Sequence, residues 1–274
     1  MPDKLEKTLY RTQDEHGDIQ VAEHNLVRSL YFGKDKKQTS MFMPEPSVLV
    51  LSYAQAMTAA LMFVNKPQRV LIVGLGGGSL IHFLQKIYPE CNIDVVELRE
   101  SVITIAQNYF LLPENSDRLS VIHEDAEAYA ESLSQKQNEA YDIILIDAFD
   151  QWGPAEINQN IQFILNCQSL LTKNGILSFN LWNRKEDEYP VTYRRFLSLF
   201  KGNLLELSLG KRDSNVILFG FNDEYHIKNI RVAEMRSARL KLDLGIDFPR
   251  YMKLIQVQNF SILKKIKKHF SLAF

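Results

Sequence analysis

From residue 69 onward, apolar runs of strand length alternate with helical stretches, and this alternation constrains the fold more than any other feature of the chain. The predicted strands cover residues 69–73, 93–97, 119–123, 141–146 and 176–181. Helices are predicted over residues 79–88, 102–110, 126–133 and 161–171, with a turn at residues 173–175. Continuous apolar strands separated by helices are typical of a parallel sheet that is covered on both faces. The sequence therefore predicts an α/β fold.

The segments on either side of this region complete the predicted architecture. A helix over residues 193–201 precedes an antiparallel hairpin of residues 204–209 and 215–221. An α/β sheet that ends in this way resembles the class I methyltransferase variant of the Rossmann fold. Upstream, we expect strands at 18–23 and 27–32, a turn at 33–37 and a helix over 51–64, with prolines between them. We predict a small N-terminal β-rich domain plus helix over residues 1–66, and a Rossmann-like nucleoside-binding catalytic domain over residues 67–274.

Composition and charge exclude several classes of partner. The chain of 274 residues has 32 Lys and Arg against 33 Asp and Glu, so its net charge gives no reason to expect nucleic acid or an anionic membrane. Cys91 and Cys167 are too few for a disulfide framework or a thiolate zinc site, which favours a reducing cytoplasm. His82 and His123 each lack a second ligand at metal-binding spacing, so no metal site is predicted. The longest apolar region, residues 48–64, is shorter than the ~20 residues that a membrane span requires.

A glycine-rich turn joins the first predicted parallel strand to its helix. Gly74, Gly76 and Gly78 allow a tight turn and a close approach of ligand, while the helix N-terminus supplies free N–H groups. Glu97 ends the next strand, 19 residues after Gly78, where a carboxylate can accept hydrogen bonds from both ribose hydroxyls. We predict a nucleoside site here, the alternative being an ordinary strand-to-helix turn. NAD is disfavoured, because the glycines do not form a clean G-x-G-x-x-G.

Two further carboxylates follow predicted strands in the same way. Asp125, followed by Ala126, comes after the strand at 119–123, and Asp147 comes after the strand at 141–146. Because ligands of open α/β sheets lie outside the carboxyl ends of the strands, these acids and Glu97 are expected to face one crevice. Asp125 is also a good candidate for a helix N-cap. Acidic residues suit the positive charge of a sulfonium nucleoside.

Residues 146–156 carry the most specific motif of the chain. The segment reads Ile-Asp-Ala-Phe-Asp-Gln-Trp-Gly-Pro-Ala-Glu, and it resembles the D-S-x-D-P-x-G-P-A-E signature of the spermidine synthases, the polyamine aminopropyltransferases. The resemblance extends over roughly residues 18 to 220. It implies that Glu97 holds the ribose, that Asp125 holds the adenine amino group, and that Asp150 orients and deprotonates the attacking amine. Tyr53 and Trp152 are implied to contact the substrate.

The chain departs from the family pattern at several positions, so the resemblance is to a divergent member. The aspartate of the family's G-G-G-D-G-G motif, which helps to hold the aminopropyl group, aligns with Gly77. Of the family's Tyr-His/Gln-Glu motif, only Tyr53 is kept, and Gln151 stands where the family has proline. Asn180, at the end of a strand, either lines the acceptor pocket or caps a loop. The nucleoside half is kept and the polyamine half is eroded.

The leading prediction is a transferase that moves an aminopropyl group from decarboxylated S-adenosylmethionine to an amine acceptor such as putrescine. The alternatives are an S-adenosylmethionine-dependent methyltransferase and a catalytically degenerate protein that binds an adenosyl ligand. The family resemblance also implies a homo-oligomer. The basic stretch at residues 262–270 is interpreted as a surface helix rather than as a membrane or nucleic-acid contact.

Overall fold

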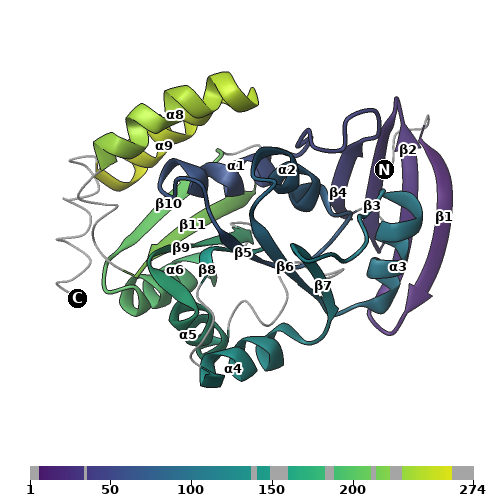
Figure 1. Cartoon of the computed structure of the whole chain (residues 1–274), viewed down its shortest axis with the longest axis horizontal. Helices are drawn as coiled ribbons and strands as arrows, with labels where there is room; N and C mark the ends of the chain where they lie inside the picture. The colour runs from purple at the N-terminus through teal and green to yellow at the C-terminus, as the bar shows by residue number, and fades with distance from the viewer. Residues whose placement is uncertain are drawn as a thin grey trace.

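The computed structural model describes residues 6–33, 36–136, 141–148, 160–182, 188–210, 214–222 and 230–260, which form two β-sheets (Figure 1). The smaller sheet is an antiparallel meander. Its strands, in spatial and chain order, are β1 (Lys7–Asp14), β2 (Gly17–His24), β3 (Val27–Phe32) and β4 (Lys36–Phe42).

The larger sheet has the order β10-β11-β9-β8-β5-β6-β7. Its strands are β5 (Arg69–Val73), β6 (Asn92–Glu97), β7 (Leu119–His123), β8 (Tyr141–Ile146), β9 (Leu171–Trp182), β10 (Leu204–Ser208) and β11 (Asn215–Phe221). Strands β5 to β9 pair in parallel, whereas β11 is antiparallel to both β9 and β10. This order confirms the predicted parallel sheet with a closing hairpin. The chain moves outward from β5 to β7 and returns to the other side of β5 at β8, which creates a topological switch point between β5 and β8.

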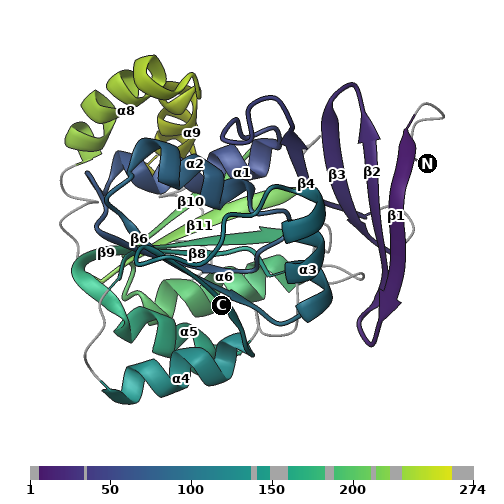
Figure 2. The ribbon, with the colours of Figure 1, turned by 45° about the vertical axis from the view of Figure 1, so that its right-hand side comes forward.

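Helices cover both faces of the larger sheet (Figure 2). One layer contains α4 (Ala126–Lys136), α5 (Ile161–Ser169) and α6 (Glu188–Leu199). The opposite layer contains α1 (Ser52–Met57), the 3-10 helix η1 (Thr58–Met62), α2 (Ser79–Ile87), α8 (Ile230–Leu244) and α9 (Phe248–Phe260). Strand β5 shows why both layers are needed: Val70 and Ile72 belong to one buried cluster, while Leu71 and Val73 belong to the other.

Helix α3 (Glu100–Tyr109) lies between the two sheets. The ring of Tyr109 stacks on that of Tyr10 from β1, with 5.2 Å between the centroids. The backbone carbonyl of Tyr109 accepts a hydrogen bond from Arg28 of β3 at 2.6 Å. The N-terminal sheet is therefore attached to the first half of the larger sheet. The predicted domain division at residue 66 stays a prediction.

Two predicted turns are wrong in detail. Strand β9 runs through residues 173–175, and its register jumps, since Tyr141 pairs with Leu171 and Ile143 pairs with Ile176. The extra residues form a bulge, in which a β-carbon at Gly175 would lie 2.8 Å from the Tyr141 carbonyl oxygen. The predicted turn at 33–37 is shortened, because Lys36 already begins β4.

Other elements were not predicted from the sequence. Strand β1 carries mostly exposed polar side chains, and helices α8 and α9 have few buried residues for their length. The helix predicted over 51–64 is present, but from Thr58 onward it continues as a 3-10 helix. The basic stretch at 262–270 lies outside the described residues. Within the part of the chain that the structure describes, no helix has both the length and the apolarity to cross a membrane.

Gly220 of β11 provides a test of the packing in the α6 layer. A methyl group at this position would lie 2.5–2.6 Å from three ring atoms of Phe200, which is 1% exposed and closely surrounded. We therefore expect Gly220→Ala to lower the free energy of unfolding by about 1–3 kcal/mol, measured by urea denaturation. Combining it with Phe200→Leu should cost less than the sum of the two single changes, because the smaller side chain relieves the overlap. Strictly additive losses would contradict this packing.

Candidate active site

The glycine-rich turn after β5 lies directly against the end of β8. Gly74 has φ +95°, and a β-carbon there would lie 2.4 Å from the backbone oxygen of Asp147. The Asp147 N–H donates to the Val73 carbonyl at 2.9 Å. Only glycine fits both the conformation and the spacing. The turn and Asp147 therefore meet at the switch point of the sheet, where open α/β folds bind ligands.

The remaining glycines of the turn lead into α2. Gly76 and Gly78 have φ values of +54° and +75°. Gly78 is the left-handed N-cap of α2, and no side chain caps the helix there. The first N–H groups of α2 thus lie at the turn, which gives it a partial positive charge suited to electron-rich ligand atoms.

Glu97 is placed against the same turn, as its position at the end of β6 predicts. The side chain is 8% exposed. Its Oε2 accepts a hydrogen bond from the Leu75 N–H and its Oε1 accepts one from the Arg99 N–H, both at 2.9 Å. Burial raises the pKa of the Glu97 carboxyl, although these N–H groups and the Arg99 charge oppose the shift. A carboxylate accepts about four hydrogen bonds, so Glu97 keeps capacity for a ligand while it holds the turn in place.

Asp125 directly precedes α4 and is exposed. Its Oδ1 accepts hydrogen bonds from the N–H groups of Glu127 at 2.8 Å and Ala128 at 3.0 Å, which confirms the predicted N-cap. The neighbouring Glu124 N–H donates to the Glu97 carbonyl at 3.2 Å. This bond brings the residue before Asp125 next to Glu97. Ala126, which follows Asp125, is buried. Its role toward adenine stays a prediction.

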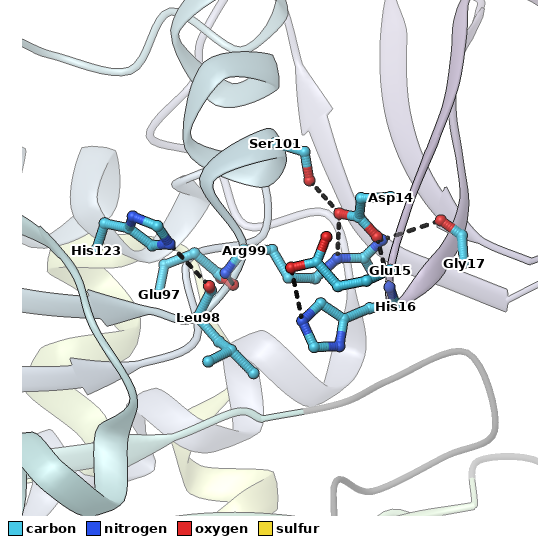
Figure 3. A network of polar contacts seen from close by, with 9 residues as sticks. All are labelled: Asp14, Glu15, His16, Gly17, Glu97, Leu98, Arg99, Ser101 and His123. Carbon is cyan, nitrogen blue, oxygen red and sulfur yellow. Dashed lines mark hydrogen bonds and ion pairs between the residues drawn. The ribbon is translucent and has the colours of Figure 1, made fainter.

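A buried ion pair fastens the N-terminal sheet to the strand end that bears Glu97 (Figure 3). The Arg99 guanidinium, 6% exposed, donates to both carboxylate oxygens of Asp14 at 2.7 and 3.0 Å, and it lies 4.3 Å from the ring centroid of Phe32. Ser101 also donates to the Asp14 carboxylate. Burial acts to raise the pKa of Asp14, yet the hydrogen bonds from Arg99, Ser101 and the His16 N–H hold it below its usual value. By holding Arg99, whose N–H donates to Glu97, the N-terminal sheet thus helps to position Glu97.

A cavity of about 330 Å³ opens on the other side of Asp147. Its walls include the side chains of Tyr53 from α1, Asn180 and Trp182 from β9, and Asn215 from β11. The Asn180 amide donates to Asp147 Oδ1 at 2.8 Å and accepts from the Asn215 amide at 2.8 Å. Of the two readings of Asn180, the structure shows the one in which it lines the pocket.

The carboxyl of Asp147, in the wall of this cavity, has a shifted pKa. Burial raises the pKa of Asp147 to about 6, against the hydrogen bond from Asn180 and the influence of the Tyr53 hydroxyl, which both favour the ionised form. In turn, burial and the Asp147 charge raise the pKa of Tyr53 well above its usual value, so the phenol stays protonated. The Tyr53 hydroxyl donates to the Gln38 carbonyl at 2.6 Å. A shifted carboxyl in a cavity is typical of a functional site.

Four further residues concern this site, of which two were predicted from the sequence and two were not. Asp150 and Trp152 lie outside the described residues. Lys36 and Lys37 line the cavity from β4, although the sequence placed them in a turn. Nothing in the spacing of the sequence brings β4 to the switch point, so only the tertiary structure reveals them. The described residues contain no cluster of His, Cys, Asp and Glu that could hold a metal ion.

The comparisons with known proteins agree with this geometry. The Spermine/spermidine synthase domain family matches residues 51–186. The polyamine aminopropyltransferase of Neisseria meningitidis serogroup A is 31% identical over 245 residues, which cover 88% of this chain and 90% of that protein. The chain therefore belongs to the spermine/spermidine synthase family, the polyamine aminopropyltransferases, and the predicted resemblance is confirmed.

Solved structures extend the comparison of the fold. A spermidine synthase in complex with the transition-state analogue AdoDATO aligns with a TM-score of 0.67 and 19% identity, over 97% of this chain and 89% of that one. Human methyltransferase-like protein 13 in complex with SAH aligns with a TM-score of 0.61 and 23% identity, over 79% of this chain and 99% of that one. The predicted methyltransferase-type fold with an N-terminal β-sheet is thereby confirmed.

Removing the partner of Arg99 tests the ion pair. In Asp14→Ala the buried guanidinium loses its carboxylate, and we expect a loss of about 3–5 kcal/mol in the free energy of unfolding. Asp14→Ala combined with Arg99→Met should cost less than Asp14→Ala alone, because no unpaired charge remains. Glu45→Ala, which breaks an exposed pair with Lys86, is the control and should cost less than about 1 kcal/mol. Equal losses in Asp14→Ala and Glu45→Ala, by denaturant titration, would refute the role of the buried pair.

The raised pKa of Asp147 predicts a pH-dependent gain in stability for Asp147→Asn. Because the folded state raises this pKa from 3.8 to about 6, the wild type loses stability as the pH rises through that window. The variant has no such loss, so its advantage should grow from none below pH 4 to about 3 kcal/mol above pH 6. Denaturant titrations between pH 3.5 and 7.5 measure this difference. Asp18→Asn, at an exposed site of β2, is the control, and a constant difference for Asp147→Asn would contradict the shift.

Proposed function

We propose that the chain is an aminopropyltransferase that uses decarboxylated S-adenosylmethionine and a small amine acceptor. The observation that carries this proposal is the contact between Gly74 and Asp147. On one side of it lies the glycine-rich turn with Glu97, and on the other side lies the cavity with Tyr53. A donor bound along the turn and an amine bound in the cavity would meet at this contact. The 31% identical aminopropyltransferase supports the assignment.

The donor half follows from the turn and its two acids. In the proposal, Glu97 accepts hydrogen bonds from the ribose hydroxyls with the lone pairs that the N–H groups of Leu75 and Arg99 leave available. Asp125 keeps one oxygen on the helix cap and uses the other for the adenine amino group. Gly74, Gly76 and Gly78 allow the ligand to approach the backbone.

The transfer half requires a neutral amine and an electrophilic carbon. The sulfonium donor supplies the carbon, and the sulfur keeps the bonding electron pair as it leaves as a neutral thioether. Asp147 binds the ammonium form of the acceptor, and Asp150 removes the proton so that the nitrogen lone pair can form the new C–N bond. The proton is thus on Asp150 after the transfer. Most of the remaining rate enhancement comes from holding the two reactants in line.

A methyltransferase is the second candidate, because two observations favour it. Gly77 replaces the acid that would hold an aminopropyl group, and the human methyltransferase-like protein shares the fold. Calorimetry with S-adenosylmethionine, its decarboxylated form, methylthioadenosine and NAD separates the candidates. We expect the decarboxylated donor to bind more tightly than S-adenosylmethionine. The reverse order of affinities would favour a methyltransferase. Binding of the donor without turnover of any amine would indicate a degenerate enzyme.

Asp150→Asn separates chemistry from binding. The amide keeps the size of the side chain but cannot take a proton, so we expect kcat to fall about 10²–10⁴-fold while the affinity for methylthioadenosine stays unchanged. Product formation with decarboxylated S-adenosylmethionine and a panel of amines, putrescine included, measures kcat.

Glu97→Ala is the complementary variant, because the ribose hydroxyls lose a charged acceptor. We expect a loss of about tenfold or more in nucleoside affinity. Unchanged turnover in Asp150→Asn would remove Asp150 from the role of base, and unchanged affinity in folded Glu97→Ala would remove Glu97 from the nucleoside site.

A further inference from the structure

Strand β11 contributes to the cavity wall a polar side chain that was not predicted from the sequence, the amide of Asn215. Asn180 of β9 pairs directly with Ile217 of β11, and Asn215 lies two residues before Ile217. Because alternate residues of a strand point to the same face, Asn180 and Asn215 are diagonal neighbours on one face of the sheet. The Asn215 amide donates to Asn180 Oδ1 at 2.8 Å.

The amide of Asn180 has a defined direction in this arrangement. It is 1% exposed, its NH2 group donates to Asp147 Oδ1 at 2.8 Å, and its oxygen accepts from Asn215. An ionised carboxylate only accepts hydrogen bonds, so turning the Asn180 oxygen toward Asp147 would bring two acceptors together. The same rotation would bring the Asn180 NH2 group against the donor of Asn215. The three side chains therefore form a hydrogen-bond chain that runs in one direction, from β11 to the carboxylate.

The carboxyl at the end of this hydrogen-bond chain is close to the balance between its two protonation states. Burial raises the pKa of Asp147 to about 6, and the hydrogen bond from Asn180 acts in the opposite direction. A change in how firmly Asn180 donates therefore alters the fraction of Asp147 that is ionised near pH 6.

Other titratable groups also belong to the cavity. Among the described residues of its wall they are Tyr53 of α1, and Lys36 and Lys37 of β4. Asp150, the proposed base, lies outside the described residues. Substitutions at Asn215 leave all of these groups in place. A comparison between such variants and the wild type therefore measures the contribution of the hydrogen-bond chain.

We infer that Asn215 is a positioning residue for the acceptor amine and that it acts through Asn180. By donating to the Asn180 oxygen, it keeps the NH2 group of Asn180 on Asp147 and favours the ionised carboxylate to which an ammonium group binds. The inference rests on the proposed function, in which Asp147 binds the ammonium form of the acceptor. Asn215 takes no part in proton transfer, so the balance of the transfer step is unchanged.

Asn215→Leu tests the inference, because it keeps the size of the side chain and removes the donor. With decarboxylated S-adenosylmethionine and putrescine, we expect kcat/KM near pH 6 to fall about threefold or more relative to the wild type. The deficit should shrink as the pH rises to about 8.5, where Asp147 is ionised in both proteins. The affinity for methylthioadenosine should stay unchanged. No loss, or the same loss at every pH, would overturn the inference.

Asn259→Leu is the matched control. The Asn259 amide joins α9 to β10, because it accepts from the Glu206 N–H at 2.9 Å and donates to the Glu206 carbonyl at 2.8 Å. It does not belong to the described wall of the cavity. We expect kcat/KM of this variant, relative to the wild type, to be independent of pH. The same pH-dependent deficit in both variants would trace the effect to a general loss of stability and overturn the inference.

Asn180→Leu shows whether Asn215 acts through Asn180. We expect this variant to change the pH dependence at least as much as Asn215→Leu does. The double variant should change it no further than Asn180→Leu alone, because Asn215 then has no amide to orient. Additive effects of the two substitutions would mean that Asn215 acts on the acceptor by another route, which would overturn the inference.

A measurement without turnover separates the failure of this inference from that of the proposed function. The gain in stability of Asp147→Asn over its parent grows up to the pKa of Asp147. In the Asn215→Leu background we expect this growth to continue about half a pH unit or more further, because the weakened hydrogen bond lets burial raise the pKa more.

Denaturant titrations of the four proteins give the answer. Equal pH dependence in the two backgrounds would overturn the inference, whatever the protein catalyses. The expected shift, together with no turnover of any amine by the wild type, would refute the proposed function and still support the effect of Asn215 on Asp147.

Discussion

The close approach of β5 and β8 at their carboxyl ends is the constraint on which the site depends. The two strands pair in register as far as Val73 and Ile146, and the chain then diverges on both sides from a point where Gly74 touches the backbone of Asp147. A side chain at residue 74 would separate the strands. Because the contact is made by backbone atoms, the glycine-rich turn and the cavity are fixed relative to each other without any side chain between them.

The N-terminal sheet contributes to both sides of this contact. Through Asp14 it holds Arg99, whose N–H supports Glu97 at the turn. Through β4 it places Lys36 and the Gln38 carbonyl at the cavity, where Tyr53 binds the latter. The N-terminal sheet is therefore part of the site. Its attachment at the glycine-rich turn relies on a desolvated ion pair, whose cost is offset by charge-assisted hydrogen bonds to both carboxylate oxygens.

These contributions explain which parts of the molecule could be predicted. Strands β5 and β8 match their predicted bounds, because central strands buried on both faces appear as continuous apolar runs. The placement of Glu97 and Asp147 was predicted from the strands that they end or follow, since the carboxyl ends of parallel strands meet at one edge of a sheet. Lys36 and Lys37 were not found, because two lysines after a glycine indicate a turn. Their placement depends on a register shift in the pairing of β4 with β3 and on the hydrogen bond from Tyr53 to the Gln38 carbonyl, neither of which leaves a pattern in the local sequence.

The glycine at residue 77, the most conspicuous departure from the family motif, has a packing cause in this molecule. A β-carbon there would lie 2.7 Å from the methyl group of Thr39 and 2.8 Å from the ring of Phe110, both of which are buried. Thr39 belongs to β4, two residues after Lys37, and its hydroxyl lies 3.4 Å from that of Ser79 at the start of α2. An acid at residue 77 is therefore incompatible with β4 in its present position. The same strand that excludes this carboxylate brings the Lys36 ammonium to the neighbouring cavity, where it lies 5.3 Å from the ring centroid of Trp182. The exclusion of an acid at residue 77 and the presence of Lys36 at the cavity wall are thus two consequences of one placement of β4.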